Sequence, residues 1–242
     1  MTSLNSKDTE FPPEAPELAG FRGPHLAVDV ALFTIAPGAD RANSRLAFLV
    51  VRRLDGLATG EWALPGRMVR EREQLSTAVE TALKEKCGLT GIEPKQLRVF
   101  DEPTRDSRGW VMSVAHLTVQ HWDFVEAALA QNPNLGLGYV QLETRFQMEL
   151  PDGQKNLPFE QDLIVRYAVQ DLQLRYRAKP DPDRFLGPTL TIYQLRKVHE
   201  AVLGKELDKD VFRRKMEPKL EKTSEMATGT VGKPAELFKR KS

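Results

Sequence analysis

The chain contains a single cysteine among its 242 residues, Cys87, so an intramolecular disulfide is excluded and a reducing cytoplasm is expected. It also lacks any apolar run that approaches the length of a membrane span, so no membrane partner is expected. The first residues lack the charged start and apolar stretch of a signal peptide. With Pro12, Pro13 and Pro16, residues 1–24 are instead predicted to form a flexible tail. The remaining composition, 40% hydrophobic and 29% charged, is ordinary for a soluble globular protein.

The net charge of +1 conceals an uneven distribution of charge along the chain. From Arg184 to the end there are 14 Lys and Arg against 8 Asp and Glu, whereas the residues before it contain 21 basic and 26 acidic side chains. A difference in sign between two parts of a chain indicates a segment that faces nucleic acid. A solvated basic surface without a partner has the same composition, so charge alone does not decide between the two.

Residues 25–156 alternate short apolar segments with amphipathic ones, which predicts a mixed domain of strands and helices. The expected strands are 27–35, 46–54, 97–101, 111–120 and 140–150, and the expected helices are 74–87 and 122–130. Pro158 occupies the favoured first-turn position of a longer helix. Residues 157–182 are therefore expected to be a linker helix between this domain and the C-terminal segment.

Residues 62–89 read WALPGRMVREREQLSTAVETALKEKCGL and contain an apolar stripe at helical spacing. Such a stripe by itself is more typical of a core helix than of an active site. The segments that flank it, however, have the spacing of a Nudix box, Gly-x5-Glu-x7-Arg-Glu-U-x-Glu-Glu-x-Gly-U, where U is a bulky apolar residue. When Gly88 and Leu89 close the motif, Glu73 falls on its first Glu position and Glu85 on one of its helical Glu positions.

The same alignment shows which groups this stretch lacks. Thr81, Ala82 and Lys86 stand where the motif has an Arg and two Glu. In a complete box, Glu residues on one helix face hold divalent cations such as Mg²⁺, which prefer oxygen ligands, and the metal activates the attacking water. Ala82 offers no ligand and Lys86 carries a positive charge, so we expect neither a metal site nor catalytic residues here.

Residues 183–242 have the pattern of a winged helix-turn-helix. Thr191 and Gln194 have capping-box spacing at the start of one helix, and Gly204 can end it with a positive φ. Asp208 is a second N-cap, and the helix after it is basic. The expected wing strands are 220–226 and 235–240. A small helical dimerisation domain with a hairpin is the alternative, but the short turn, the basic helix and the wing occur in the order that DNA binding requires.

Three stretches resemble the Nudix-related transcriptional regulators, the NrtR family: WALPGRMVREREQL with KEKCGL; FDEPTRDSRGWVMSVAHL at 100–117; and LTIYQLRKVHEAVLGKELDKDVFRRKM with GKPAELFKR after it. The resemblance implies an α+β protein with a Nudix-like α/β/α sandwich that senses an effector over residues 25–156. The linker helix, 157–182, and a winged helix domain, 183–242, come after it. Members of this family typically dimerise, bind palindromic operators and control NAD biosynthesis or sugar use. Several respond to ADP-ribose and are poor or inactive hydrolases, so the resemblance implies a homodimeric repressor that is not an enzyme.

A nucleotide effector favours particular side chains. Arginine binds a diphosphate through bidentate hydrogen bonds, and an adenine or ribose stacks on an aromatic ring such as that of Trp62 or Trp110. Any one of these residues could equally be a solvated arginine or a core tryptophan, but together they favour an anionic, nucleotide-like ligand without a required cofactor. The candidate effector-binding residues are Arg52, Arg53, Trp62, Glu73, Glu85, Lys86, Arg105 and Arg108.

For double-stranded DNA, the basic second helix of the C-terminal domain is the candidate recognition helix, where an arginine can contact a guanine through a bidentate pair. Basic residues at its first turn and on the wing are expected to contact phosphates, and the start of the preceding helix to lie near the backbone. The candidate DNA-binding residues are Thr191, Gln194, Lys209, Arg213, Arg214, Lys215, Lys233, Lys239 and Arg240.

Two other functions are compatible with the sequence. A Nudix-type nucleoside-diphosphate hydrolase with an accessory domain would need metal ligands from outside residues 62–89. A pseudo-enzyme that binds a protein partner through its basic C-terminal segment would not contact DNA at all.

Overall fold

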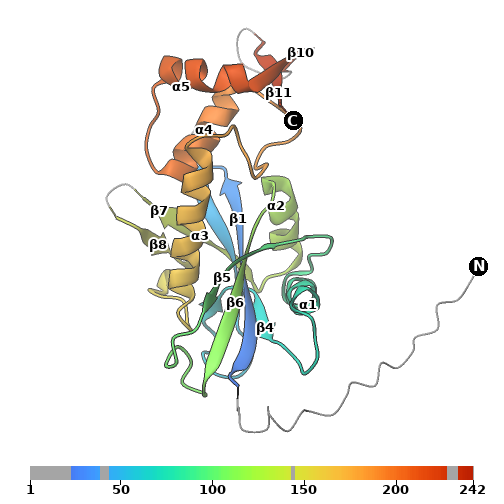
Figure 1. Cartoon of the computed structure of the whole chain (residues 1–242), viewed down its shortest axis with the longest axis vertical. Coiled ribbons are helices and arrows are strands. Elements are labelled where there is room, and N and C mark those ends of the chain that lie inside the picture. The colour runs from blue at the N-terminus through green and yellow to red at the C-terminus, as the bar shows by residue number, and fades with distance from the viewer. Residues whose placement is uncertain (1–22, 39–43, 143–144, 228–233, 242) are drawn as a thin grey trace, which may run out of the picture.

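The computed structural model describes residues 23–38, 44–142, 145–227 and 234–241 (Figure 1). An eight-stranded sheet with three helices forms the N-terminal part, and a three-stranded sheet with two helices forms the C-terminal part. Most of the predicted tail, residues 1–22, lies outside the described residues, as does the tip of the predicted wing, 228–233. None of the helices in the described ranges combines the length and the apolar character that a bilayer crossing requires.

The large sheet has the strand order β5-β6-β1-β2-β7-β8, and β3 and β4 pair with β2 and β1. Strands β1 and β6 run parallel, whereas the other described pairs in this sheet are antiparallel. The strands are β1 (His25–Ala36), β2 (Arg45–Arg52), β3 (Trp62–Ala63), β4 (Gly66–Met68), β5 (Lys95–Phe100), β6 (Val111–Val119), β7 (Leu135–Gln141) and β8 (Gln147–Glu149).

Strand β1 lies in the interior of this sheet, and its composition explains why. Residues 27–34 are buried without interruption. Because successive side chains of a strand point to opposite faces, Ala31 and Phe33 belong to one hydrophobic core and Val30 and Leu32 to the other. A strand that is apolar on both faces needs cover on both, which the helices provide.

Helices cover both faces of the sheet and form the predicted α/β/α sandwich (Figure 1). Helices α1 (Leu75–Cys87) and α2 (Trp122–Gln131) pack on one face, and α3 (Gln161–Tyr176) packs on the other. The apolar stripe of α1 faces the sheet, as its spacing predicts. Its buried residues are Ala78, Val79, Ala82, Leu83 and Cys87.

The structure corrects the single strand expected over residues 140–150. Strand β7 ends at Gln141 and pairs antiparallel with β8, with Tyr139 opposite Glu149. Two short strands therefore form a hairpin at the edge of the sheet. The predicted turn after it is present as a single turn of 3-10 helix, η2 (Pro151–Gly153).

The start of α3 also differs from the prediction. The helix begins at Gln161 rather than Pro158, because Phe159 and Glu160 have φ values of 58° and 57°. This left-handed region is unfavourable for residues other than glycine and interrupts a right-handed helix. Pro158 consequently lies in the turn that leads into α3. The helix ends at Tyr176, before the proline-containing segment, as predicted.

The C-terminal part is a winged helix-turn-helix, and its predicted signals are confirmed. Thr191 and Gln194 form the capping box, Gly204 ends the first helix with a φ of 66°, and the Asp208 side chain accepts hydrogen bonds at the start of the second. The elements are β9 (Thr189–Leu190), α4 (Ile192–Leu203), α5 (Lys209–Met216), β10 (Leu220–Met226) and β11 (Glu236–Arg240). Its separate hydrophobic core contains Leu190, Leu195, Phe212, Met216, Leu220 and Phe238.

The end of α3 is joined to the winged helix through the fully buried carboxylate of Asp181. The Tyr176 hydroxyl donates a hydrogen bond to one carboxylate oxygen over 2.6 Å, and the Arg240 guanidinium forms an ion pair with the other. The backbone N–H groups of Phe185 and Leu186 donate to the same carboxylate over 2.9 and 3.0 Å. Because a buried carboxylate is stable only when it has partners, these contacts hold the two parts together.

His199 on α4 is fully buried beside this carboxylate. Its ring makes edge contacts with Tyr176 and Phe212, with centroid distances of 5.0 and 5.1 Å. Burial lowers the pKa of His199 to about 4; the nearby Asp181 opposes this shift, and two lysines of the winged helix add to it. The imidazole is therefore neutral in the folded chain at neutral pH.

We expect the chain to lose stability as the pH falls from about 6.5 to about 4. The unfolded chain protonates this histidine near its ordinary pKa of about 6.5, but the folded chain does so only near pH 4. Since the unfolded state binds more protons across this interval, the free energy of unfolding falls by about 3 kcal/mol in total. Urea unfolding across this interval measures the loss. His199→Gln should remove this part of the pH dependence, and an unchanged dependence in the variant would contradict the assignment.

Candidate functional site

A cavity of about 230 Å³ opens between the end of β2, the chain after β3 and the last turn of α1. It brings together four of the predicted effector residues. Arg52 and Arg53 come from the end of β2, and Glu85 and Lys86 come from α1. Asp55 adds a second carboxylate to the lining. The cavity thus combines three cationic side chains with two anionic ones.

Lys86 is tied to the first residue of β4 and to the residue that follows α2. Its ammonium group donates a hydrogen bond to the backbone carbonyl of Gly66, and the Asn132 side chain donates to the Lys86 carbonyl over 3.0 Å. Burial lowers the pKa of Lys86, and the positive charge of Arg53 lowers it further, while two nearby aspartates oppose the shift. Lys86 and Arg53 are therefore close enough to repel each other.

Glu73, predicted as an effector contact, does not line this cavity. Its carboxylate pairs with Arg67 over 2.6 Å and accepts a hydrogen bond from the Arg70 N–H over 2.8 Å. The Arg70 hydrogen bond and the Arg67 guanidinium lower the pKa of Glu73, so it is ionised at neutral pH. Arg67, which stands where the box glycine would fall, holds this carboxylate locally.

Trp62, predicted as a stacking surface, belongs to the hydrophobic core and does not line the cavity. Its side chain is buried, and its indole N–H donates to Asp152 over 3.0 Å. The Arg52 guanidinium lies over the ring, 4.6 Å from its centroid, and also pairs with Asp152. The Arg52 guanidinium therefore already covers a face of the ring. Trp110, by contrast, is half exposed.

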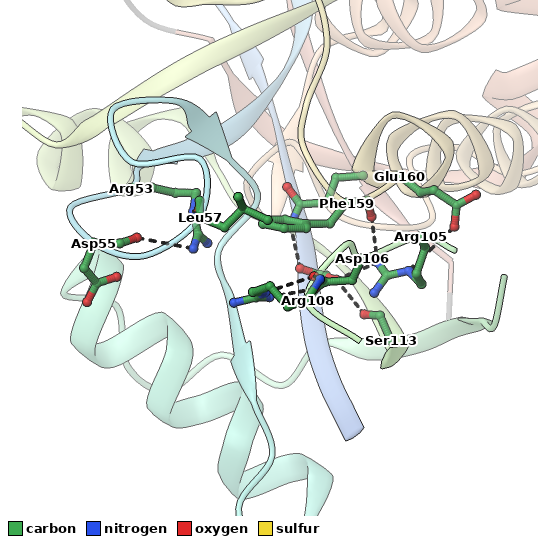
Figure 2. A network of polar contacts seen from close by, with 11 residues as sticks. Arg53, Asp55, Leu57, Arg105, Asp106, Arg108, Ser113, Phe159 and Glu160 are labelled. Carbon is green, nitrogen blue, oxygen red and sulfur yellow. Dashed lines mark hydrogen bonds and ion pairs between the residues drawn. The ribbon is translucent and has the colours of Figure 1, made fainter. Parts of the chain in front are cut away.

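Arg53 and Arg108 converge on the ring of Phe159, in the turn before α3 (Figure 2). Each guanidinium carbon lies 5.0 Å from the ring centroid, within the range of a cation–π interaction. The Leu57 carbonyl accepts a hydrogen bond from Arg53 over 2.8 Å, and Asp106 holds Arg108 with bonds of 2.9 and 2.6 Å. Arg108 is therefore a neighbour of Arg53 but does not line the cavity.

Arg105, predicted as a ligand contact, is buried and does not line the cavity. Its guanidinium donates to the Phe159 carbonyl over 2.7 Å (Figure 2). The same group lies 3.7 Å from the carboxylate of Asp29 and 3.6 Å from that of Glu160. Arg105 thus supports the turn before α3 rather than presenting a free cation.

Asp29, which is not among the residues predicted from the sequence, is the central buried acid of this region. Its two carboxylate oxygens accept hydrogen bonds from Ser113 over 2.5 Å and from the Gln161 side chain over 2.6 Å. Gly66 approaches so closely that a Cβ there would lie 2.5 Å from the carboxylate. The lone acid in the apolar segment AVDVALF was the available signal, because an acid in a buried strand requires partners.

The basic residues of α5 differ in how free they are. Arg213 pairs with Glu217 over 2.7 Å and with Glu236 over 3.5 Å. The Lys215 ammonium donates to a backbone carbonyl just beyond α3 over 2.9 Å. Arg214 is exposed and makes no hydrogen bond or ion pair with the residues that the structure describes. Arg214 is therefore the most available arginine of this helix.

The other predicted DNA contacts lie in three settings. Lys209 at the start of α5 and Lys239 on β11 are exposed. Thr191 and Gln194 hydrogen bond to each other as helix caps. Lys233 lies outside the described residues.

Arg240, predicted as a phosphate contact, is mostly buried and paired within the chain. Its guanidinium pairs with Asp181 and donates to the carbonyls of Leu186 and Gly187 over 2.9 and 3.0 Å. These bonds hold the guanidinium against other residues of this chain.

Known proteins share both parts of this architecture. Residues 184–239 match the model of the NrtR DNA-binding winged helix domain. The chain is 23% identical over 222 residues to the "ADPR responsive transcriptional repressor NtrR" of Acinetobacter baylyi, a match that covers 90% of this chain and 83% of that protein.

Two solved structures are similar over most of the chain. The structure of Shewanella oneidensis NrtR complexed with a 27mer DNA has a TM-score of 0.71 and 26% identity, and the match covers 89% of this chain and 93% of that one. A MutT/nudix family protein from Enterococcus faecalis has a TM-score of 0.70 and 23% identity, with 92% and 90% covered. The second likeness shows the fold alone.

A Nudix-like sandwich joined to a winged helix defines a class of two-domain chains in which one domain has the fold of a nucleotide-processing enzyme and the other that of a DNA-binding module. Residues 184–239 match the NrtR winged helix domain, and the chain as a whole is similar to the Nudix-related transcriptional regulators, the NrtR family.

We expect Arg105→Ala to lower the free energy of unfolding by about 3 kcal/mol, because it removes the cation beside the buried Asp29 and the donor to the Phe159 carbonyl. Arg214 is the control, since it is exposed and makes no hydrogen bond or ion pair with the residues that the structure describes. Arg214→Ala should change the same quantity by less than about 1 kcal/mol. Urea denaturation of both variants measures the difference, and equal losses would show that Arg105 has no special structural role.

Proposed function

We propose that the chain is a DNA-binding transcriptional repressor whose Nudix-like domain, residues 25–156, senses a nucleotide such as ADP-ribose. The observation that carries the proposal is the union, in one chain, of a cation-lined cavity and a winged helix with an exposed basic recognition helix. The names of the relatives support it, since one is an ADPR responsive repressor and another was crystallised with DNA. Residues 157–182 would be the linker and 183–242 the DNA-binding domain.

In this proposal α5 enters the major groove. Arg214 has no internal partner among the described residues, so it suits a bidentate contact with guanine. Lys209 and Lys239 are exposed and suit phosphate contacts. Two copies related by a two-fold axis would match a palindromic operator, so we propose a homodimer that controls genes of NAD metabolism or sugar use.

The cavity beside α1 suits the diphosphate of such a nucleotide. Arg52, Arg53 and Lys86 outnumber Asp55 and Glu85 in its lining. Arginine offers a planar pair of donors to phosphate oxygens, and lysine offers a compact positive charge. An anion in this cavity would relieve the repulsion between Arg53 and Lys86.

Arg53 connects this cavity to the winged helix. It lines the cavity and also lies on the ring of Phe159, in the turn before α3. The other end of α3 is tied to the winged helix through Tyr176 and Asp181. A ligand that draws Arg53 toward a phosphate removes one of the contacts that hold the turn. Because coupling is reciprocal, a nucleotide that weakens DNA binding must bind less well to the DNA-bound protein by the same factor.

A Nudix-type hydrolase with an accessory domain is the second candidate. The observation in its favour is Glu85, a carboxylate of the box that still lines the cavity. The two candidates differ in their products, because a hydrolase would cleave ADP-ribose and release AMP.

Selection of genomic DNA fragments by the full-length chain should enrich a palindromic site, and ADP-ribose should change the affinity for that site. The selected site is then used in a titration with and without ADP-ribose. Incubation with ADP-ribose and Mg²⁺ should release no AMP above a protein-free control. Failure to enrich any sequence would contradict DNA binding, and appreciable AMP would favour the hydrolase.

Arg214→Ala should weaken operator binding by about 1–3 kcal/mol if Arg214 contacts a base. Arg213→Ala is the matched comparison on the same helix, and it should have a smaller effect because its guanidinium already pairs with Glu217 and Glu236. A gel-shift titration at fixed salt measures both. Binding by Arg214→Ala that equals that of the unchanged chain would remove Arg214 from the interface.

A further inference from the structure

The side chains around the cavity do not form a site for the divalent cation that a Nudix fold implies. Ala82 is fully buried in the core and has no ligand atom. Glu73 is held by Arg67, away from the cavity. Lys86 places an ammonium group where the box has its last Glu. Within the described ranges, no group of three or more His, Cys, Asp and Glu could hold a metal ion. Magnesium needs several oxygen ligands in near-octahedral array, which this donor set does not supply.

We propose that the Lys86 ammonium takes the place of the metal, so that the chain binds the diphosphate of its nucleotide without a divalent cation. The inference rests on the proposed nucleotide-sensing function and specifies its chemistry. The ammonium has three N–H donors, and the Gly66 carbonyl accepts one of them. The remaining donors are available to phosphate oxygens at the position where a cation would otherwise neutralise them.

The surroundings of Lys86 fit this role. The side chain is partly buried at the C-terminal end of α1, where water screens its charge less than at an exposed site. Arg53 lines the same cavity and is close enough to lower the pKa of Lys86. Two cations that repel each other across one cavity are stabilised by an anion between them. The bond to Gly66 holds the ammonium in place before any ligand arrives, which reduces the entropy lost on binding.

Calorimetric titration of the full-length chain with ADP-ribose, once with EDTA and once with excess Mg²⁺, tests the inference without any mutation. We expect the two dissociation constants to agree within about twofold. Affinity more than about tenfold weaker in EDTA would overturn the inference while leaving nucleotide sensing intact. Absence of binding under both conditions would instead reject the proposed function, and the inference with it.

Variants of Lys86 test the residue itself. Lys86→Met keeps the length of the side chain and removes its charge, and it should weaken ADP-ribose binding in EDTA by about tenfold or more. Lys86→Glu should weaken it further, because it places another carboxylate beside Glu85. Lys84→Met is the matched control, since Lys84 is exposed in the same last turn of α1 and does not line the cavity. The thermal midpoint of each variant verifies folding, and a folded Lys86→Met that binds as the unchanged chain does would overturn the assignment.

Discussion

The buried carboxylate of Asp29 is the constraint on which the N-terminal half depends. An acid inside an apolar strand is costly unless it is hydrogen bonded, and each of its partners comes from a different element. Ser113 belongs to β6, Gln161 begins α3, and Arg105 lies in the loop between β5 and β6. Gly66 leaves room for the carboxylate beside β4. One charged group thus sets where a parallel strand pair, a loop and a helix meet.

A second buried acid does the same at the far end of α3. Asp181 collects Tyr176 from the helix and Arg240 from the wing strand, so the helix is held by a carboxylate near each end. The cavity beside α1 meets the first of these junctions through Arg53 and Phe159, and the winged helix meets the second through Arg240. A rigid helix between two polar junctions is suited to carry a displacement from one domain to the other, since neither end can move without exchanging hydrogen-bond partners.

Local features were predictable from the sequence, and long-range pairings were not. The capping box at Thr191 depends on residues three apart, so spacing alone reveals it. The two-core sheet is a consequence of the uninterrupted buried run of β1, which is apolar on both faces apart from Asp29 and Thr34. Arg240 pairs with a residue 59 positions away, and the pairing depends on how the two segments pack. No sequence pattern indicates it, so the sequence alone predicts a surface position for that arginine. Glu73 has its hydrogen-bond partners close in sequence, at Arg67 and Arg70, but whether its carboxylate also reaches a ligand depends on the packing around it.

The parallel pairing of β1 with β6 has a consequence for how the chain folds during synthesis. Strand β1 emerges first and can pair with β2 as a hairpin, with Phe33 opposite Phe48. Its other edge stays open until β6 has been made, because His25 pairs with Val111, and contacts so distant in sequence close slowly. Even then Asp29 lacks its donor from Gln161. A chain that stopped at the end of the predicted sensing domain would expose one apolar face of the sheet and leave that acid short of a partner. The Nudix-like sandwich and α3 are therefore a single folding unit.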